Sequence, residues 1–313
     1  MSVLIFAEAK NGNYKKNAQE AVYYGAQLAS AVGTEAFVFT IGDGAQAADL
    51  GKFGASKIWF NNASANTDSQ VVSSLVAQAA EKAGATHVVL SNTALGKAIA
   101  GRLAVKLDAS LVSGANALPQ GNVLTKGVFS GKAIASFELS GEKHVISLMG
   151  NSLQPVETGS SGIPESLELN VPESKLKVID TKTVDGVVPL PEAELVVSAG
   201  RGMKGPENWG IIEDLANVLG ATTACSRPVA DTGWRPHHEH VGQTGVAIRP
   251  NLYIAAGISG AMQHLAGVNS SKTIVVINKD PEAPFFKAAD YGVLGDLFDV
   301  VPKLTEAIKK FKA

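Results

Sequence analysis

A strand, a glycine-rich loop and a helix follow one another in the last third of the chain. Residues 195–199 form a buried strand pattern, the loop is Gly200-Arg201-Gly202-Met203-Lys204-Gly205, and residues 207–219 have helical periodicity. Glycines at this spacing let the backbone turn tightly and approach a pyrophosphate, whose charge is stabilised at a helix N-terminus. The unit therefore predicts a parallel α/β domain and favours a dinucleotide ligand.

The first half of the chain alternates short apolar segments with helical patterns. Strands are predicted at residues 3–7, 37–41, 57–60 and 87–90, and helices at residues 17–31, 69–83 and 96–107. Such alternation indicates βαβ units and a parallel sheet. Four further strand-like segments at residues 111–118, 122–129, 132–139 and 144–149 predict an antiparallel β layer appended to that sheet.

The predicted fold class is α/β with two domains. Residues 1–190 form the N-terminal α/β domain and residues 191–313 form a Rossmann-like, doubly wound domain with strands at 195–199, 222–225, 252–256, 273–277 and 291–294. Residues 184–192 contain two prolines between these blocks and are interpreted as an interdomain linker that lets the second domain swing.

Composition excludes several classes of protein. Hydrophobic residues make up 45% and charged residues 18%, and the net charge of −2 includes no basic stripe for nucleic acid. The single cysteine, Cys225, excludes an internal disulfide and a cysteine-built metal site, and it fits a reducing compartment. With no apolar run of membrane-spanning length and no signal-peptide pattern, we expect a cytoplasmic protein that is not membrane-embedded.

Polar, glycine-rich segments follow the predicted strands of the second domain. In a parallel sheet these segments meet at one edge, which is where ligands bind, so they predict a phosphate and sugar site. Arg227 stands where an acidic residue normally contacts the ribose of NAD. An NADP site with Arg227 on the 2′-phosphate is therefore one interpretation.

No catalytic motif accompanies this edge. The sequence has no Gly-x-Ser-x-Gly elbow, no Walker loop and no His-Glu-x-x-His helix, and we interpret His237-His238-Glu239-His240 as a loop rather than a metal site. We therefore predict no catalytic residues and no metal, and we expect the cofactor itself to be the working part of the protein.

Several segments of the last third occur in a characteristic order. They are Gly200-Arg201-Gly202, Ala224 to Pro228, Val241-Gly242-Gln243-Thr244-Gly245, Gly257 to Leu265, Asn278 to Pro284, Asp290-Tyr291-Gly292 and Asp296-Leu297. With these segments the chain closely resembles the α subunit of electron transfer flavoprotein from about residue 195 onward. Over residues 1–190 the resemblance is one of architecture and length.

The resemblance implies an electron carrier rather than an enzyme, which forms a heterodimer with a β subunit and holds FAD in its C-terminal domain. Acyl-CoA or other flavin dehydrogenases would donate electrons, a quinone oxidoreductase would accept them, and the N-terminal domain would serve as scaffold and partner interface. The FAD-binding residues that it implies are Arg201, Ser226, Arg227, Val241, Gly242, Gln243, Thr244, Ser259, Gly260, Ala261, Met262, Gln263, His264, Asn278, Asp296 and Leu297.

Within this set the resemblance implies separate roles. Ser226 and Arg227 would lie by the isoalloxazine, Gln243 and Thr244 near its N5 and C4 edge, and His264 at the N1–C2 carbonyl edge. Arg201, residues 259–264 and Asn278 would hold the pyrophosphate, the ribityl chain and the ring edge. Asp296 and Leu297 would border the adenosine. The alternatives are an NADP-binding oxidoreductase domain and a non-redox nucleotide module that regulates a partner.

Overall fold

The computed structural model describes residues 1–10, 12–63, 68–129, 133–159, 161–180 and 188–312. The chain divides into two compact units, Met1–Val128 with Ile134–Lys182, and Phe129–Ala133 with Thr183–Ala313. We call them the N-terminal unit and the C-terminal unit. Residues 184–187 of the predicted linker lie outside the described residues. Its last residues form the short 3₁₀ turn η2 (Leu190–Glu192), and Leu190 packs into the core of the C-terminal unit.

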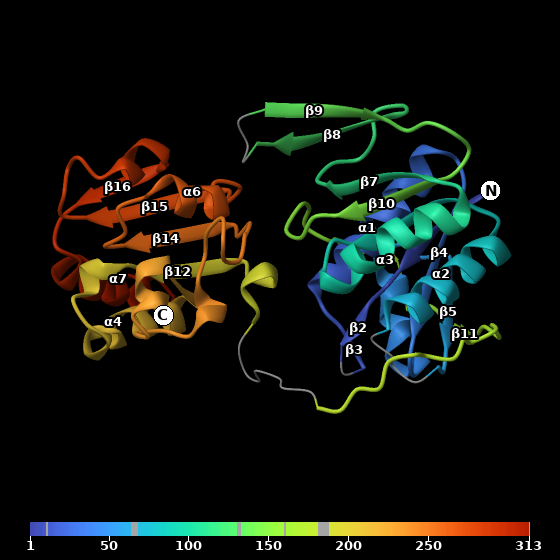
Figure 1. Ribbon diagram of the computed structural model, residues 1–313, viewed down its shortest axis with the longest axis horizontal. Helices are drawn as coiled ribbons and strands as arrows, with labels where there is room; N and C mark the ends of the chain where they lie inside the picture. Colours follow the sequence, from blue (N-terminus) through green and yellow to red (C-terminus); the bar gives the residue numbers. More distant parts are fainter. Residues whose placement is uncertain (11, 64–67, 130–132, 160, 181–187, 313) are drawn as a thin grey trace. The chain divides into compact units, whose positions relative to one another are not determined.

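The N-terminal unit is built on a seven-stranded sheet with the order β11-β5-β4-β1-β6-β10-β7 (Figure 1). All its pairings are parallel. Its strands are β1 (Ser2–Phe6), β4 (Glu35–Ile41), β5 (Lys57–Asn61), β6 (Ala85–Ser91), β7 (Ser110–Ala115), β10 (His144–Leu148) and β11 (Pro164–Ser166). All residues of β1 are buried, as expected for a central parallel strand covered on both faces.

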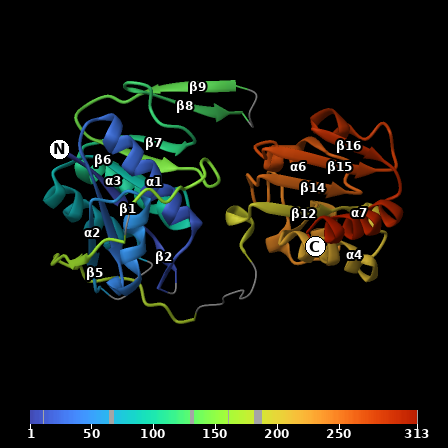
Figure 2. The same cartoon turned by 180° about the vertical axis from the view of Figure 1, so that it is seen from behind.

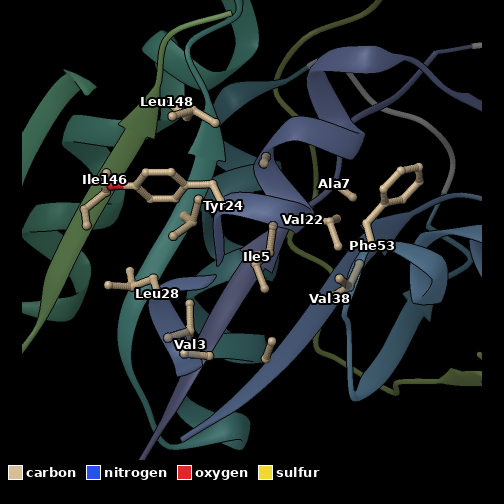
Figure 3. Packing of buried hydrophobic residues seen from close by; sticks show 14 of the residues in the cluster. Val3, Ile5, Ala7, Val22, Tyr24, Leu28, Val38, Phe53, Ile146 and Leu148 are labelled. Atoms are coloured by element: carbon tan, nitrogen blue, oxygen red, sulfur yellow. The ribbon is translucent and has the colours of Figure 1, made fainter. Parts of the chain in front are cut away.

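Helices cover both faces of this sheet. On one face lie α1 (Lys16–Ala31) and the 3₁₀ segment η1 (Gly44–Phe53), and on the other lie α2 (Ser69–Ala83) and α3 (Ala94–Leu107). Figure 3 shows how Tyr24 and Leu28 of α1 pack among residues of the sheet. Side-chain caps mark the starts of α2 and α3: Asp68 accepts a hydrogen bond from Gln70 N, and Thr93 accepts one from Gly96 N.

The antiparallel part of this unit is smaller than the sequence predicts. Only β8 (Val123–Val128) and β9 (Ala133–Glu138) form a separate two-stranded sheet in this region, while β7 and β10 join the main sheet in parallel. The α/β fold class is confirmed, but the placement of residues 111–118 and 144–149 in an antiparallel layer is wrong. Residues 145–148 of β10 are buried because the strand lies between β6 and β7, a position that an apolar run alone does not specify. A short hairpin of β2 (Ala9–Lys10) and β3 (Asn13–Tyr14) follows β1.

The C-terminal unit contains a five-stranded parallel sheet with the order β13-β12-β14-β15-β16. Its strands are β12 (Leu195–Ala199), β13 (Thr222–Cys225), β14 (Leu252–Ala256), β15 (Thr273–Asn278) and β16 (Tyr291–Leu294). After β13 the chain crosses back over β12 to form β14, so the strand order reverses between β12 and β14. In open parallel sheets the crevice at such a reversal is the usual binding place for a ligand.

Two layers of helices cover the C-terminal sheet. On one face α4 (Gly210–Leu219) and α7 (Leu297–Lys312) pack together against Val197 and Ile254 (Figure 2). On the other face lie α6 (Met262–Val268) and the 3₁₀ turn η6 (Pro284–Ala288). The remaining short elements are η3 (Arg201–Met203), η4 (Pro206–Asn208), α5 (Arg227–Asp231) and η5 (His237–Glu239). Within the described parts of the chain, no helix is both long and apolar enough to cross a membrane.

Candidate functional site

A cavity of about 380 Å³ lies at the reversal of strand order in the C-terminal sheet. Its walls come from the loops that follow β12, β13 and β14 and from the first residues of α6. The lining residues are Gly200, Arg201, Ser226, Arg227, Pro228, His240, Val241, Gly242, Gln243, Thr244, Gly257, Ile258, Ser259, Ala261, Gln263 and His264. We call it the large cavity.

A smaller cavity of about 60 Å³ shares Gly257 with the large one. It lies among the ends of β12, β14 and β15 and the start of α7. Its lining residues are Gly202, Lys204, Gly257, Asn278, Lys279, Asp296 and Leu297. The two cavities thus follow one rim of the sheet, with cationic side chains at Arg201, Lys204 and Lys279. This arrangement suits an elongated ligand that carries negative charge.

The glycine loop after β12 packs against protein rather than opening a helix. A Cβ atom on Gly200 would lie 2.4 Å from the Gly257 carbonyl oxygen, and one on Gly202 would lie 2.7 Å from Gly257 Cα. Gly202 N also donates to the Gly257 carbonyl at 3.1 Å. Two 3₁₀ turns then precede α4, which begins at Gly210. The helix predicted at residues 207–219 therefore begins at Gly210, after the 3₁₀ turn, and a pyrophosphate at its N-terminus stays a prediction.

The loop between His240 and Val246 forms a second wall of the large cavity. Val241 N donates to the Cys225 carbonyl at the end of β13, and Val246 N donates to the His240 carbonyl. Gln243 N donates to the Gln263 carbonyl at 2.7 Å, which ties the loop to α6. These backbone bonds hold the exposed side chains of Gln243 and Thr244 at the cavity.

Arg227 and Thr244 connect two walls of the large cavity. Arg227 Nη1 donates to Thr244 Oγ1 at 3.4 Å, and Arg227 Nε pairs with Asp231 at 3.2 Å. The Arg227 side chain is 60% exposed, so solvent screens its charge. Ser226, immediately before it, is buried at the N-terminus of α5. A permanent cation and two hydroxyls therefore face the same space.

His264 is a neutral histidine in the cavity wall. Its Nε2 lies 2.7 Å from the Tyr253 hydroxyl, and the side chain is 6% exposed. Burial, together with the nearby His240, lowers the pKa of His264 to about 4, while the Val241 backbone opposes this shift. Nδ1 is buried and has no hydrogen-bond partner of normal geometry among the described residues. An orphaned polar atom of this kind suits a site whose ligand supplies the missing partner.

Asn278 and Asp296, at the smaller cavity, are partly committed to the fold. Asn278 Nδ2 donates to the Ile258 carbonyl at 3.0 Å, and its Oδ1 accepts from Asp280 N. Asp296 Oδ1 accepts from Phe298 N at 3.0 Å and caps α7. Both side chains therefore shape the rim of the smaller cavity through the loops they hold.

Most of the predicted site residues come together at these two cavities. Those at the large cavity are Arg201, Ser226, Arg227, Val241, Gly242, Gln243, Thr244, Ser259, Ala261, Gln263 and His264. Those at the smaller cavity are Asn278, Asp296 and Leu297. Gly260 and Met262 line neither cavity. A Cβ atom on Gly260 would lie 2.5 Å from Phe285 Cβ, and Met262 is 73% exposed. The contacts of all these residues with FAD stay predictions.

The sequence did not single out His240 as a cavity residue. Within the run 237–240, the Glu239 carboxylate forms an ion pair with Arg235 at 2.6 Å. His240 instead forms an isolated backbone β-bridge with Cys225, and it lines the large cavity. Burial lowers the pKa of His240, and the Arg227 charge acts in the same direction. The signal in the sequence was its position directly before Val241-Gly242, but nothing local showed that the side chain turns inward.

Comparison with known proteins assigns both units to one family. Residues 3–174 match the electron transfer flavoprotein domain, and residues 189–269 match the electron transfer flavoprotein FAD-binding domain. The chain is 37% identical to the electron transfer flavoprotein subunit alpha of Mycobacterium leprae, over 99% of this chain and 98% of that protein. It is 36% identical to the subunit alpha of Bacillus subtilis, over 98% and 97%. It is 38% identical to that of Mycobacterium tuberculosis strain H37Rv, over 99% of each. The cofactor is therefore FAD rather than NADP.

Proposed function

The chain belongs to the electron transfer flavoprotein α-subunit family, and from this premise we propose that it is an electron carrier rather than a substrate-converting enzyme. It pairs with a β subunit. Its FAD takes electrons from flavin dehydrogenases, such as acyl-CoA dehydrogenases, and passes them to a quinone oxidoreductase. The swing of the C-terminal unit about residues 184–192 between donor and acceptor is part of this proposal.

The observation that carries the proposal is the pair of adjoining cavities at the reversal of strand order. The large cavity, about 380 Å³, has room for a ring system and is faced by a cation, hydroxyls and a neutral histidine. The smaller one is bordered by Asp296 and Leu297, which we assign to the adenosine end. Between them, Arg201 and the backbone around Gly257 and Ser259 would hold the pyrophosphate.

FAD, when bound, supplies a ring that accepts and releases electrons. The residues of this chain bind it and adjust how readily it is reduced. Arg227 provides a permanent positive charge beside the large cavity, which stabilises negative charge on a ligand there. Thr244 supplies a hydroxyl at the same wall. His264 acts as a neutral hydrogen-bonding group, because burial keeps its pKa near 4.

The N-terminal unit has a separate proposed role. We assign it to scaffold and to the interface with the β subunit. It is a complete layered α/β structure with buried cores on both faces of its sheet.

A cytoplasmic location is proposed on the single cysteine, which is typical of a reducing compartment.

The test is co-expression of the chain with a β subunit, followed by visible absorbance spectroscopy of the purified complex. We expect a yellow complex that contains FAD, that is bleached by a substrate-reduced acyl-CoA dehydrogenase and that regains its colour with a quinone oxidoreductase. A complex that retains FAD but exchanges electrons with neither protein would refute the carrier role. A chain that forms no complex with a β subunit would refute the heterodimer.

A further inference from the structure

Tyr253 and His264 form a buried hydrogen-bonded pair behind the wall of the large cavity. Tyr253 lies on β14 and is fully buried, and its hydroxyl is 2.7 Å from His264 Nε2. Both rings pack against Phe285, with centroids 6.3 Å and 5.7 Å from it. The orientation of the histidine ring is therefore held from two sides.

Both members of the pair are uncharged at neutral pH. The pKa of His264 is near 4, because burial and the neighbouring His240 disfavour the imidazolium. Burial also raises the pKa of Tyr253, which keeps its phenolic hydrogen. A neutral imidazole carries one hydrogen, on either Nδ1 or Nε2, and the partner of one nitrogen decides which.

The surroundings of the Tyr253 hydroxyl indicate the direction of the hydrogen bond. The separation of 2.7 Å between this hydroxyl and His264 Nε2 is short enough for donation in either direction, so the other possible partners of the hydroxyl decide. The other hydroxyl beside Tyr253 belongs to Ser198, and its oxygen has no hydrogen bond of normal geometry among the described residues. The tyrosine hydrogen therefore belongs on the bond to Nε2.

We propose that Tyr253 is a positioning residue, which donates to Nε2 and so holds neutral His264 in the form that carries its hydrogen on Nδ1. The surroundings of Nδ1 agree with this assignment. His264 lines the large cavity, and its Nδ1 is buried and makes no hydrogen bond of normal geometry among the described residues. The N–H at Nδ1 is therefore left for an acceptor on a ligand.

The consequence for the cofactor rests on the proposed function. A histidine fixed in this form offers the flavin a hydrogen-bond donor without adding positive charge. The position of the hydrogen on His264 does not depend on that function. An experiment can therefore refute the tautomer without refuting the electron-carrier role, and the reverse.

The first experiment is ¹⁵N NMR of the purified complex, with ¹⁵N-histidine only in this chain and with His264→Gln used to assign the signals. We expect a protonated, pyrrole-type Nδ1 and a pyridine-type Nε2 at pH 7. A protonated Nε2 in the wild-type protein would overturn the proposal. This result is decisive whether or not the preparation contains flavin, and it requires no variant of Tyr253.

The second experiment compares Tyr253→Phe with Tyr24→Phe. The control also removes a buried tyrosine hydroxyl, which donates to the Ala117 carbonyl at 3.0 Å in the N-terminal unit. In Tyr253→Phe we expect the His264 hydrogen to move toward Nε2 and the ratio of reduced to oxidised flavin at a fixed potential to fall several-fold. Tyr24→Phe should change neither. A Tyr253→Phe spectrum identical to that of the wild type would refute the assignment.

Discussion

Glu20 makes the stability of the N-terminal unit depend on pH in an unusual direction. This glutamate lies on α1 with its side chain 1% exposed and with Lys16 at 3.6 Å. Burial raises the pKa of Glu20 from 4.5 to about 7, although Lys16 and the backbone at Asn151 and Ser152 act against the shift. The fold therefore favours the protonated carboxyl.

The size of the effect follows from this gap of about 2.5 between the two pKa values. Each pH unit corresponds to about 1.4 kcal/mol, so the folded state is penalised by about 3 kcal/mol once Glu20 is ionised. Below pH 4.5 the carboxyl is protonated in both the folded and the unfolded state, and the penalty is absent. It grows as the pH rises from 4.5 to 7 and is constant above that.

Glu20→Gln should remove the penalty. We expect the variant to be more stable than the wild type by up to about 3 kcal/mol at pH 8, with the gain shrinking toward zero near pH 4.5. The free energy of unfolding can be measured by urea titration with hydrogen-exchange mass spectrometry of α1, which reports on the N-terminal unit alone. Glu81→Gln, at an exposed glutamate of α2, is the matched control and should give no such trend.

Two results would refute this reasoning. The first is a stability difference between Glu20→Gln and the wild type that is the same at pH 5 and at pH 8. The second is a variant that is less stable than the wild type at pH 8, since the glutamate would then contribute more as a charged partner of Lys16 than it costs by burial.

Three further predictions concern the C-terminal unit. Arg227→Ala should lower the flavin midpoint potential by roughly 20 mV, which is equivalent to about 1 kcal/mol for a screened charge, and Thr244→Ala should also change this potential. If potentiometry of the two variants shows no change while FAD is lost, both residues only bind the cofactor. Gly202→Ala should destabilise the unit by about 2–4 kcal/mol in urea unfolding, because the added methyl group meets the Gly257 backbone and forces apart the hydrogen bond from residue 202 N to the Gly257 carbonyl. Gly210→Ala, where the added carbon meets no atom within 4 Å outside its own helix and its chain neighbours, should not destabilise the unit; equal effects would contradict the packing argument. Burial and a nearby carboxylate raise the pKa of Cys225 to about 12. Its thiol should therefore be alkylated at pH 8 about a thousandfold more slowly in the folded protein than after unfolding. Similar alkylation rates in the folded and unfolded protein would show that the thiol is accessible.

The sequence was a good guide to the buried parallel strands. The bounds of β12, β13 and β14 agree with those predicted, because β12 and β14 are largely apolar and each of the three strands is followed by a glycine or a serine. The order of the strands in the N-terminal sheet was not predictable in the same way. The segment that becomes β10 has the same apolar pattern whether it joins a hairpin or enters between β6 and β7, so its direction and neighbours depend on the folding of the rest of the sheet.

The candidate site could be located from the sequence because the loops after parallel strands necessarily meet at one edge. Its chemistry was harder to predict. Neither the inward turn of His240 nor the pairing of His264 with Tyr253 leaves a local signal, since both depend on residues that are distant in the sequence. Helix starts were also approximate: α3 begins at Ala94 rather than at residue 96, and α4 begins at Gly210 rather than at residue 207.

The contact between Gly200, Gly202 and Gly257 changes what a glycine signature means in a chain of this type. These glycines are required where two neighbouring strand ends touch, so any side chain there is excluded by the protein itself, before a ligand arrives. The charged residues beside them, Arg201 and Lys204, face the cavities and are free of that constraint. Ligand preference can therefore be redesigned at the charged positions while the glycines are kept. A sequence search that scores the glycine spacing alone therefore detects a close contact between two strand ends. Such a contact does not by itself require a nucleotide.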